Sequence, residues 1–489
     1  MTILVVDVGT SGVRGAVVRP DSAVEHIHRV PVLPDTPFPG LVEFDAVAMA
    51  DAVTAVASRC LADGGPVDAV GIANQRASTI VWDRSTGLPV GPGLGWQDLR
   101  TVGTCLELQG QGIRVAPNAS ATKLAALLDS ADPDRSRSER GELAFGTVDT
   151  WVAWTLSDRH LHVTDASNAG VTGLLRGDGS GWDPRLLDAL RIPAALLPAI
   201  VDSSGVVGLA TSLTGCPPIA GMAGDQQASL IGQGCTRPGQ AKATFGTGGM
   251  LDQCIGAERP PHPARGPAGT IPIIAWQRNS RPTWGVEAIM LSAGTCVEWL
   301  RDDLAIIDSA AASAEVAGQC DGTDDVWFVP ALLGLGTPVW DFGARGTFTG
   351  ITRGTGRPAL VRAVLEGVAH RGADLLEAAE SDSGLTVGAL RIDGGMSANP
   401  VFTRALTEAC GRTIEIAPVL EATTLGAAYL AGMAVGTWAG EDEVAAAWSP
   451  REVLEPEGAE GERAARRSRW LDARSRSERT VPELSALDF

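Results

Sequence analysis

The sequence lacks the residue clusters that mark several protein classes. Its 8 cysteines are scattered and none stands in a C-x-x-C pair, which argues against both a disulfide framework and a zinc site. The 6 histidines form no ligand cluster; His26 with His28, and His160 with His162, have the spacing of one strand face. No apolar run reaches membrane-spanning length, and the run that follows Met1 is interrupted by Asp7, so we expect neither a membrane anchor nor a signal peptide.

Positive charge is also scarce. The 39 basic residues are outnumbered by 58 acidic ones, which gives a net charge of −19. This balance disfavours nucleic acids and anionic membranes as partners and favours solubility. With neither a signal peptide nor a membrane anchor expected, we expect a cytoplasmic protein. A chain of 489 residues exceeds a single core, so two domains are expected. The composition does not decide whether the chain is a homodimer.

Several common catalytic motifs are missing. The segment from Gly234 to Gly239 has the glycine spacing of a P-loop, but Gln240 and Ala241 stand where Lys and Ser or Thr are required. There is no G-x-G-x-x-G after a strand, no H-E-x-x-H and no G-x-S-x-G. These absences disfavour P-loop and Rossmann nucleotide sites, zinc peptidases and α/β-hydrolases.

Two similar hairpins are predicted instead. The run from Ile3 reaches Asp7 and a Gly-Thr-Ser-Gly turn at residues 9–12, and a second apolar run follows. The same pattern recurs in residues 241–249, where a strand-like run ends in Gly-Thr-Gly-Gly. Glycine-rich turns with hydroxyl groups can bind phosphate oxygens. A carboxylate beside such a turn, as at Asp7, is a site for hydrated Mg²⁺.

The stretch from Gly221 to Met250 adds a catalytic carboxylate. Asp225 is followed by two glutamines, and Lys242 precedes the second glycine turn. A carboxylate that accepts a proton beside a phosphate site is the minimum that phosphoryl transfer to a hydroxyl requires.

The rest of the pattern predicts an α/β protein. In the first half we expect a helix over 45–63, strands over 67–72 and 79–83, and a helix over 121–129. The charged run 132–140 is predicted as a solvated loop. A strand-to-helix junction is expected over 145–154, with Asp149 as its N-cap.

The boundary between the halves is predicted in the Gly- and Pro-rich segment 232–239. Beyond it we expect a strand over 325–330, a helix over 358–379 and a strand over 389–392. That last strand leads into Asp393-Gly-Gly395, where a nucleotide could bind at a helix N-terminus. Residues 441–489 are predicted as a solvated helix and tail. The domains are thus 1–236, 237–445 and a C-terminal segment 446–489.

Taken together, these motifs resemble the FGGY carbohydrate kinases, and within them the glycerol kinases. The resemblance covers residues 3–440, with the motifs in the same order: DVGTSGVRG, GIANQRASTIVWDRSTG, GWQDLRT, FGTVDTWVAWTLSDRHLHVTDASNA, GDQQASLIGQ, KATFGTGG and DGGMSANP. It implies two ribonuclease-H-like, actin-like domains with ATP and substrate bound between them, and phosphate transfer to a primary hydroxyl of a polyol or sugar.

The resemblance also implies residue roles. Asp225 would be the general base, and Asp7 would hold Mg²⁺ through water. The phosphates of ATP would contact Thr10, Ser11, Arg14, Thr247 and Gly248, and the nucleoside would contact Gly294, Glu298, Gly395 and Asn399. Glu298 stands where the family usually has Gln. The substrate would contact Arg76, Trp96, Asp225 and Gln226.

Three residues of the implied substrate pocket depart from the glycerol kinase pattern. Ala77 stands where N-Q-R-E has a polyol-binding Glu, Asn118 replaces a Tyr, and Met250 replaces a Phe. Loss of a charged hydrogen-bond partner costs ~1.5–3 kcal/mol, so glycerol is expected to bind less well than in an ordinary glycerol kinase. The smaller side chains at 77 and 118 suit a longer polyol or a ketose.

Three alternatives stay open. One is a non-catalytic, actin-like nucleotide-binding regulator, which the retained Asp7 and Asp225 disfavour. Another is an acyl-phosphate-forming kinase of the same superfamily, which needs no general base. The third is a ketose kinase of the xylulokinase type, whose pattern differs around residues 75–78.

Overall fold

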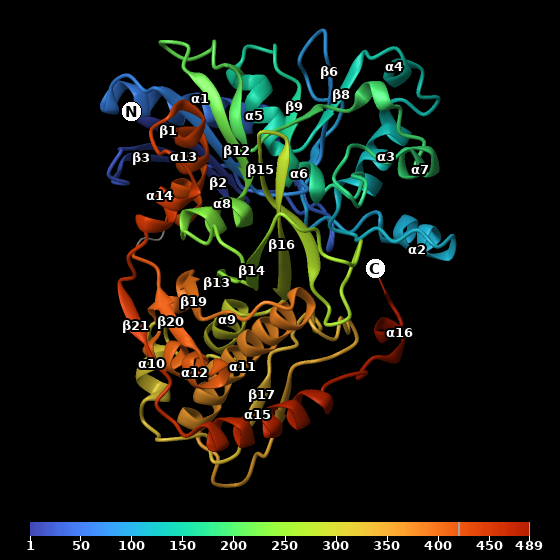
Figure 1. Ribbon diagram of the computed structural model, residues 1–489. Coiled ribbons are helices and arrows are strands. Elements are labelled where there is room, and N and C mark those ends of the chain that lie inside the picture. Colours follow the sequence, from blue (N-terminus) through green and yellow to red (C-terminus); the bar gives the residue numbers. More distant parts are fainter. Residues whose placement is uncertain (419–420, 489) are drawn as a thin grey trace.

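The computed structural model describes residues 1–418 and 421–488 (Figure 1). Its central feature is a 13-stranded sheet. The strands follow the order β21 (Glu452–Leu454), β20 (Thr413–Ile416), β19 (Ala389–Asp393), β13 (Ala241–Phe245), β14 (Gly249–Gly256), β16 (Arg281–Met290), β15 (Ile271–Arg278), β11 (Ser204–Leu209), β12 (Pro218–Gly224), β5 (Ala69–Asn74), β1 (Ile3–Gly9), β2 (Gly12–Val18) and β3 (Val24–Pro31). Strands β11 and β15 share only the pair Ser204 and Arg278, so the sheet consists of two halves.

The two halves repeat one topology. In the first, β1 and β2 form an antiparallel hairpin that closes at Gly9 opposite Gly12, and β5 and β12 add in parallel beside β1. In the second, β13 and β14 form a hairpin that closes at Phe245 opposite Gly249, and β19 and β20 add in parallel beside β13. Both predicted hairpins and the two-domain α/β fold are confirmed.

Helices cover both halves (Figure 1). They are α1 (Ala46–Gly64), α2 (Val102–Gly110), α3 (Ser120–Ala131), α4 (Ser136–Glu139), α5 (Val148–Leu156), α6 (Ala166–Gly170), α7 (Pro184–Ala189), α8 (Asp225–Gly232), α9 (Gly294–Asp302), α10 (Ala312–Ala317), α11 (Arg357–Ser383), α12 (Pro400–Cys410), α13 (Ala422–Val435), α14 (Glu441–Ala446), α15 (Glu460–Ser475) and α16 (Pro482–Ser485). Among the described residues, no helix is both long and apolar enough to cross a membrane.

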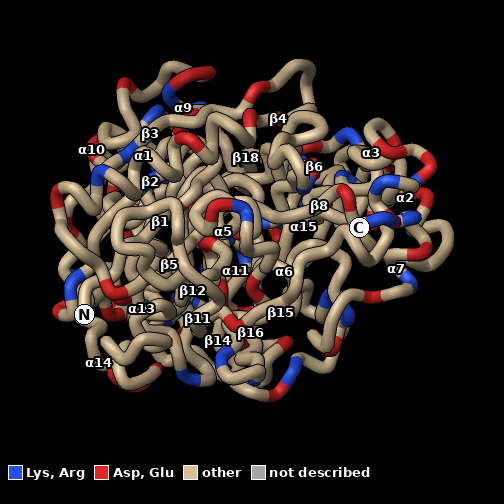
Figure 2. The backbone as a smooth tube through the Cα atoms, turned by 90° about the horizontal axis from the view of Figure 1, so that it is seen from above, with Lys and Arg blue, Asp and Glu red and all other residues tan. Residues whose placement is uncertain are grey.

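Short strands make up smaller two-stranded sheets. Strand β4 (Glu43–Phe44) pairs with β7 (Gly93–Leu94), β6 (Ile80–Asp83) with β8 (Leu143–Gly146), β9 (Val163–Asp165) with β10 (Ala199–Val201), and β17 (Trp327–Val329) with β18 (Thr347–Thr349). Seen from above, the positions of basic and acidic residues are interspersed along the backbone (Figure 2).

Helix α1 illustrates how the sequence sets a helix and its buried face. The Asp45 carboxylate caps it, accepting from the amide N–H groups of Val47 at 2.8 Å and Ala48 at 3.0 Å. The residues Val53, Val56, Ala57 and Cys60 recur at helical spacing and are buried against β2.

Helix α13 lies outside the half to which its sequence belongs. It follows β20 in the chain, yet it packs on β12, β5 and β1 of the first half and on α8 (Figure 1). The approach of α13 to α8 is close, because a β-carbon built on Gly426 would lie 1.7 Å from the Ala228 carbonyl oxygen. The second half therefore reaches back over the helix that begins with Asp225.

Two sequence-based expectations are wrong in the first half. Residues 132–140 are not a solvated loop: they contain α4, and Asp132, Arg135 and Ser138 are buried. The Asp132 carboxylate accepts from the Ser138 hydroxyl at 2.7 Å, and Arg135 donates to main-chain carbonyl groups. Asp149 is not an N-cap, because Thr147 holds that position and Asp149 lies inside α5.

The expectation for residues 441–489 is confirmed only in part. Helix α15 is present and most of its residues are exposed, but strand β21 extends the main sheet and α15 packs one face on α12 and β17. Its Trp470 is fully buried, and Arg467 and Arg474 pair with the buried Asp374 of α11. Part of the Arg-rich stretch is therefore an internal ion-pair surface.

Candidate active site

The first glycine turn joins β1 to β2 and carries the half-buried Thr10 and the exposed Ser11. Asp7 lies opposite Arg14 in the hairpin register, so one acidic and one basic side chain flank the turn. Burial raises the pKa of Asp7 to about 6, the Asp225 carboxylate adds to this rise, and Arg14 opposes it.

The second glycine turn is tied to the start of α9. The Thr247 carbonyl accepts from the Ala293 amide at 2.9 Å, and Gly294 donates its amide to the Gly246 carbonyl at 2.8 Å. A β-carbon on Gly248 would meet the Met290 carbonyl at 2.8 Å, so this turn requires glycine there. Thr247, Gly248 and Gly294 are thus brought together, and Glu298 is exposed one turn further along α9.

The Asp393-Gly-Gly395 turn lies against the same hairpin. Gly394 has φ 88°, and a β-carbon on it would lie 2.5 Å from the Phe245 carbonyl oxygen. Gly395 opens a short 3₁₀ turn, and Asn399 caps α12 by accepting from the amides of Val401 and Phe402. The Asn399 amide nitrogen also donates to the Ser313 hydroxyl at 3.0 Å, so this side chain already has partners.

Arg76 and Asp225 meet where the parallel strands β5 and β12 end. Arg76 Nε lies 3.4 Å from Asp225 Oδ1, and Arg76 Nη2 lies 2.7 Å from Glu287 Oε2 of β16 in the second half. Burial raises the pKa of Asp225, while the Arg76 guanidinium lowers it. A partly buried carboxylate with a raised pKa is suited to accept a proton.

Trp96 and Gln226 connect this pair to the two hairpins. Trp96 donates its indole N–H to the Thr10 hydroxyl of the first turn at 3.3 Å. Gln226 Oε1 accepts from Lys242 of β13 at 2.6 Å. Trp96 is therefore bonded to the first predicted phosphate turn, and Gln226 to the strand that leads into the second.

The three departures from the glycerol kinase pattern lie around Arg76 and Trp96. Ala77 is buried with φ 60°, and its carbonyl accepts from the Ser120 hydroxyl at 3.0 Å. Met250 Sδ lies 3.7 Å from Arg76 Nη2. Asn118 follows Pro117, whose carbonyl accepts from Lys123 Nζ at 2.9 Å; the same amine donates to the Trp96 carbonyl at 3.4 Å.

Comparison with known proteins decides the family. The N-terminal domain of the FGGY family of carbohydrate kinases matches residues 2–232, and the C-terminal domain of that family matches residues 241–435. The chain belongs to this family. It is therefore an ATP-dependent phosphotransferase that acts on a sugar or polyol.

Individual FGGY relatives agree. The chain is 38% identical to the glycerol kinase of Rhodopirellula baltica, over 99% of this chain and 92% of the relative. It is 41% identical to glycerol kinase 2 of Thermotoga maritima, over 90% and 91%. The solved glycerol kinase of Plasmodium falciparum with ADP matches with a TM-score of 0.91 and 27% identity, over 97% and 98% of the two chains. The xylulose kinase of Lactobacillus acidophilus, at 20% identity and a TM-score of 0.85, shares the fold.

This FGGY protein also contains a row of buried charged residues, Arg76, Glu287, Asp252 and Lys242, whose connection the sequence analysis did not predict. From Glu287 it continues to Asp252, its cross-strand neighbour on β14, and Asp252 Oδ2 lies 2.8 Å from Lys242 Nζ. Burial raises the pKa of Glu287 to about 7, opposed by Arg76 and reinforced by Asp252. The sequence does contain a sign of these residues, because Glu287, Asp252 and Lys242 are each an isolated charge within a mostly apolar strand. It does not show which strands pair, and so it does not show that the charges meet.

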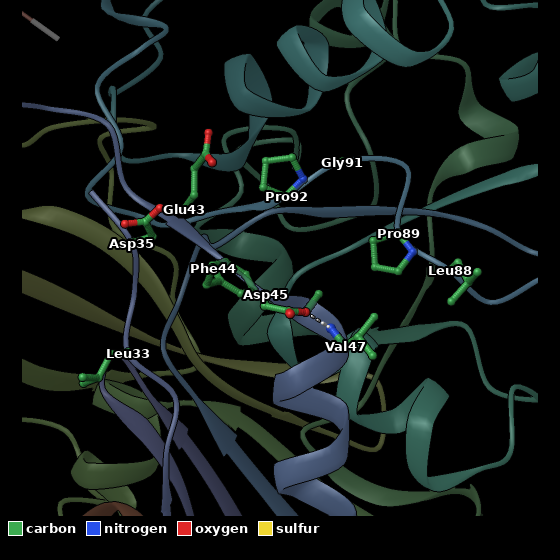
Figure 3. Close-up of a pocket in the computed structure, with 11 residues that line it drawn as sticks. Leu33, Asp35, Glu43, Phe44, Asp45, Val47, Leu88, Pro89, Gly91 and Pro92 are labelled. Atoms are coloured by element: carbon green, nitrogen blue, oxygen red, sulfur yellow. Dashed lines mark hydrogen bonds between the residues drawn. The ribbon is translucent and has the colours of Figure 1, made fainter. Parts of the chain in front are cut away.

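A separate cavity lies away from these residues. It has a volume of about 570 Å³ and is lined by Leu33, Asp35, Glu43, Phe44, Asp45, Ala46, Val47, Leu88, Pro89, Gly91 and Pro92 (Figure 3). Its walls combine aliphatic side chains with carboxylates, and the Asp45 carboxylate is engaged with the Val47 amide. None of the predicted site residues of this FGGY kinase lines it.

Proposed function

We propose that this kinase transfers the γ-phosphate of ATP to a primary hydroxyl of glycerol, a longer polyol or a ketose, with Asp225 as general base. The observation that carries the proposal is the contact of Asp225 with Arg76 at 3.4 Å, together with the bonds of Trp96 to Thr10 in the first glycine turn and of Gln226 to Lys242 on the strand before the second. The relatives named as glycerol kinases support a polyol substrate.

In the proposed reaction the substrate hydroxyl gives its proton to Asp225, and its oxygen forms a bond to the γ-phosphorus. The bond from that phosphorus to the bridging oxygen breaks, and ADP leaves. Arg76, Trp96 and Gln226 would orient the substrate. Thr10, Ser11, Arg14, Thr247 and Gly248 would surround the phosphates, and Gly294, Glu298, Gly395 and Asn399 would border the nucleoside.

We also propose a magnesium ion at Asp7, held through water. The residues fit such an ion, because Asp7 lies near the end of β1, beside the turn that carries Thr10 and Ser11, and the negative charge of Asp225 raises the pKa of Asp7, an effect that a divalent cation would offset. The ion would shield the charge of the phosphates. The halves, divided near residues 236 and 237, would close around the reactants and exclude water.

The identity of the substrate depends on the residues beside Arg76. A buried methyl group at Ala77, a small amide at Asn118 and a flexible thioether at Met250 leave fewer groups for reading glycerol hydroxyls. A panel of C3 to C6 polyols and ketoses, followed by ADP release, tests this. A hundredfold preference for glycerol would contradict our interpretation of the pocket, and an acid-labile product would indicate an acyl phosphate instead.

The general base is tested by Asp225→Asn. We expect kcat to fall by a factor of ~10²–10⁴ because the amide accepts no proton, while the affinity for ATP stays within about twofold. ADP release gives the first quantity and nucleotide titration the second. Asp132→Asn, which changes a buried carboxylate outside the site, is the control and should retain its rate. Full activity in Asp225→Asn would exclude the assignment.

A further inference from the structure

A buried polar turn at residues 165–168 joins the two strands that deliver Arg76 and Asp225. It comprises the end of β9 and the start of α6, beside β12 (Figure 1). The side chains of Asp165, Ser167 and Asn168 are fully buried. Buried polar groups are costly unless they have partners, so the partners of these three define what the turn holds.

Asn168 holds the end of β5. Its amide nitrogen donates to Asn74 Oδ1 at 3.0 Å, and the Asn74 amide nitrogen donates back to Asn168 Oδ1 at 2.9 Å. Asn74 is the last residue of β5 and stands two residues before Arg76. Parallel pairing places it beside Gly224 on β12 and Val8 on β1, so this amide pair lies where three strand ends meet.

Ser167 holds the end of β12. The Gly224 amide N–H donates to Ser167 Oγ at 3.0 Å. Gly224 immediately precedes Asp225 and is the N-cap of α8. The peptide group that carries this N–H lies one residue before Asp225. Its orientation therefore affects where the Asp225 side chain points.

Asp165 holds Ser167 and Asn168 in place. Its carboxylate accepts from the Ser167 hydroxyl at 3.0 Å and from the Asn168 amide nitrogen at 2.8 Å, as well as from both backbone N–H groups. It also accepts from the Ser203 hydroxyl at 2.6 Å. The turn is therefore a rigid unit whose two side chains reach two different strands.

We infer that Ser167 and Asn168 are positioning residues, which set the place of Asp225 and Arg76 relative to each other through Gly224 and Asn74. This inference rests on the proposed role of Asp225 as general base. Displacement of a reacting group by about 1 Å can cost ~100-fold in rate, so a bond that orients the residue before the base affects kcat.

Ser203 provides a matched control for Ser167. Both serines are buried, both hydroxyls donate to the Asp165 carboxylate, and both accept a backbone N–H, from Gly224 at 3.0 Å and from Gln277 at 3.0 Å respectively. Only Ser167 contacts the residue before Asp225. The variants Ser167→Ala and Ser203→Ala therefore remove equivalent bonds in different places.

We expect both variants to lower the melting temperature equally. Ser167→Ala should lower kcat by about tenfold or more with KM for ATP unchanged, and Ser203→Ala should keep kcat within about twofold. Equal loss of kcat in the two variants, or none in Ser167→Ala, would overturn the inference.

Hydrogen exchange gives a reading that does not depend on turnover. Amides of residues 221–227 should exchange faster in Ser167→Ala than in Ser203→Ala, because the Gly224 N–H loses its acceptor. Unchanged exchange there would overturn the inference even if Asp225→Asn were inactive. Faster exchange in Ser167→Ala together with an active Asp225→Asn would exclude Asp225 as the general base. It would still support the contact by which Ser167 orients Gly224.

Discussion

At the scale of single residues, the site is distinguished by what surrounds Arg76. Ala77 removes the carboxylate that glycerol kinases have after Arg76, while Glu287 contacts Arg76 at 2.7 Å from the other half of the molecule. The guanidinium therefore already has one strong partner. Substrate hydroxyls must therefore form hydrogen bonds with other groups of the pocket. A substitution at position 77 is the most direct test of substrate specificity.

Ala77→Glu tests specificity directly. Position 77 already carries a β-carbon at φ 60°, so the substitution adds little backbone strain. We expect kcat/KM for glycerol, relative to a C5 polyol, to rise by about tenfold, since a charged acceptor is restored. Coupled measurement of ADP release for both substrates gives this ratio.

Ala77→Gln is the control for Ala77→Glu, because it has a similar volume without the charge. An equal gain in the two variants would show that size alone selects the substrate. A fall in the ratio would mean that Glu at this position does not face the polyol.

The sequence predicted those features that depend on residues close together in the chain. The hairpins at residues 9–12 and 246–248 were predictable because glycine turns between apolar runs carry a local signal. Asp132 and Arg135 were not, because their burial depends on partners provided by the folded turn. Glu287 and Lys242 belong to the same class, since the partner of Glu287 is Arg76 from the other half and the partner of Lys242 is Asp252 on the neighbouring strand.

At the scale of elements, α15 shows the same limit. Its Arg-rich composition suggested a solvated helix, yet Trp470 and Ala473 stand at i,i+3 spacing and form its buried face. Trp470 stacks on the ring of His370 from α11, with ring centroids 5.2 Å apart. The docking of α15 therefore depends on a buried imidazole.

The docking of α15 should weaken in acid. Burial lowers the pKa of His370 to about 3, helped by Arg467 and Arg466 and opposed by Asp374. The native state keeps this imidazole neutral, whereas the unfolded chain protonates it near pH 6.5. Stability contributed by the neutral ring is thus present above pH 6.5 and falls as pH drops toward 3, by ~1.4 kcal/mol per unit.

His370→Phe should remove this dependence, because it keeps an aromatic ring against Trp470 and has no proton to gain. Denaturant midpoints of the two proteins, measured at pH 7, 6 and 5, should diverge in favour of the variant at pH 5. Parallel curves over that range would mean that the imidazole is not held neutral in the folded protein.

At the scale of the whole molecule, the two halves are joined by more than the chain crossing near residues 232–239. Helix α13 comes from the second half, covers the first half's β5 and β12, and touches α8. A β-carbon on Gly232 would lie 1.8 Å from the Ala422 carbonyl oxygen, and one on Gly426 would lie 1.7 Å from that of Ala228. Gly232 of α8 and Gly426 of α13 each allow the backbone of the other helix to come close. The position of Asp225, the first residue of α8, therefore depends on α13.

Gly426→Ala should therefore affect both stability and catalysis. The added methyl group meets a main-chain carbonyl that no side-chain rotation can relieve, so α8 and α13 must move apart. We expect a loss of ~3 kcal/mol or more in stability and a fall in kcat, because the start of α8 shifts with the helix. Gly103→Ala in α2 is the control: nothing lies within 4 Å of its β-carbon, so alanine should stabilise by ~0.5–1 kcal/mol. If the melting temperature and kcat of Gly426→Ala equal those of the unmodified protein, α8 and α13 do not pack as closely as these distances require, and the position of Asp225 does not depend on the helix from the second half.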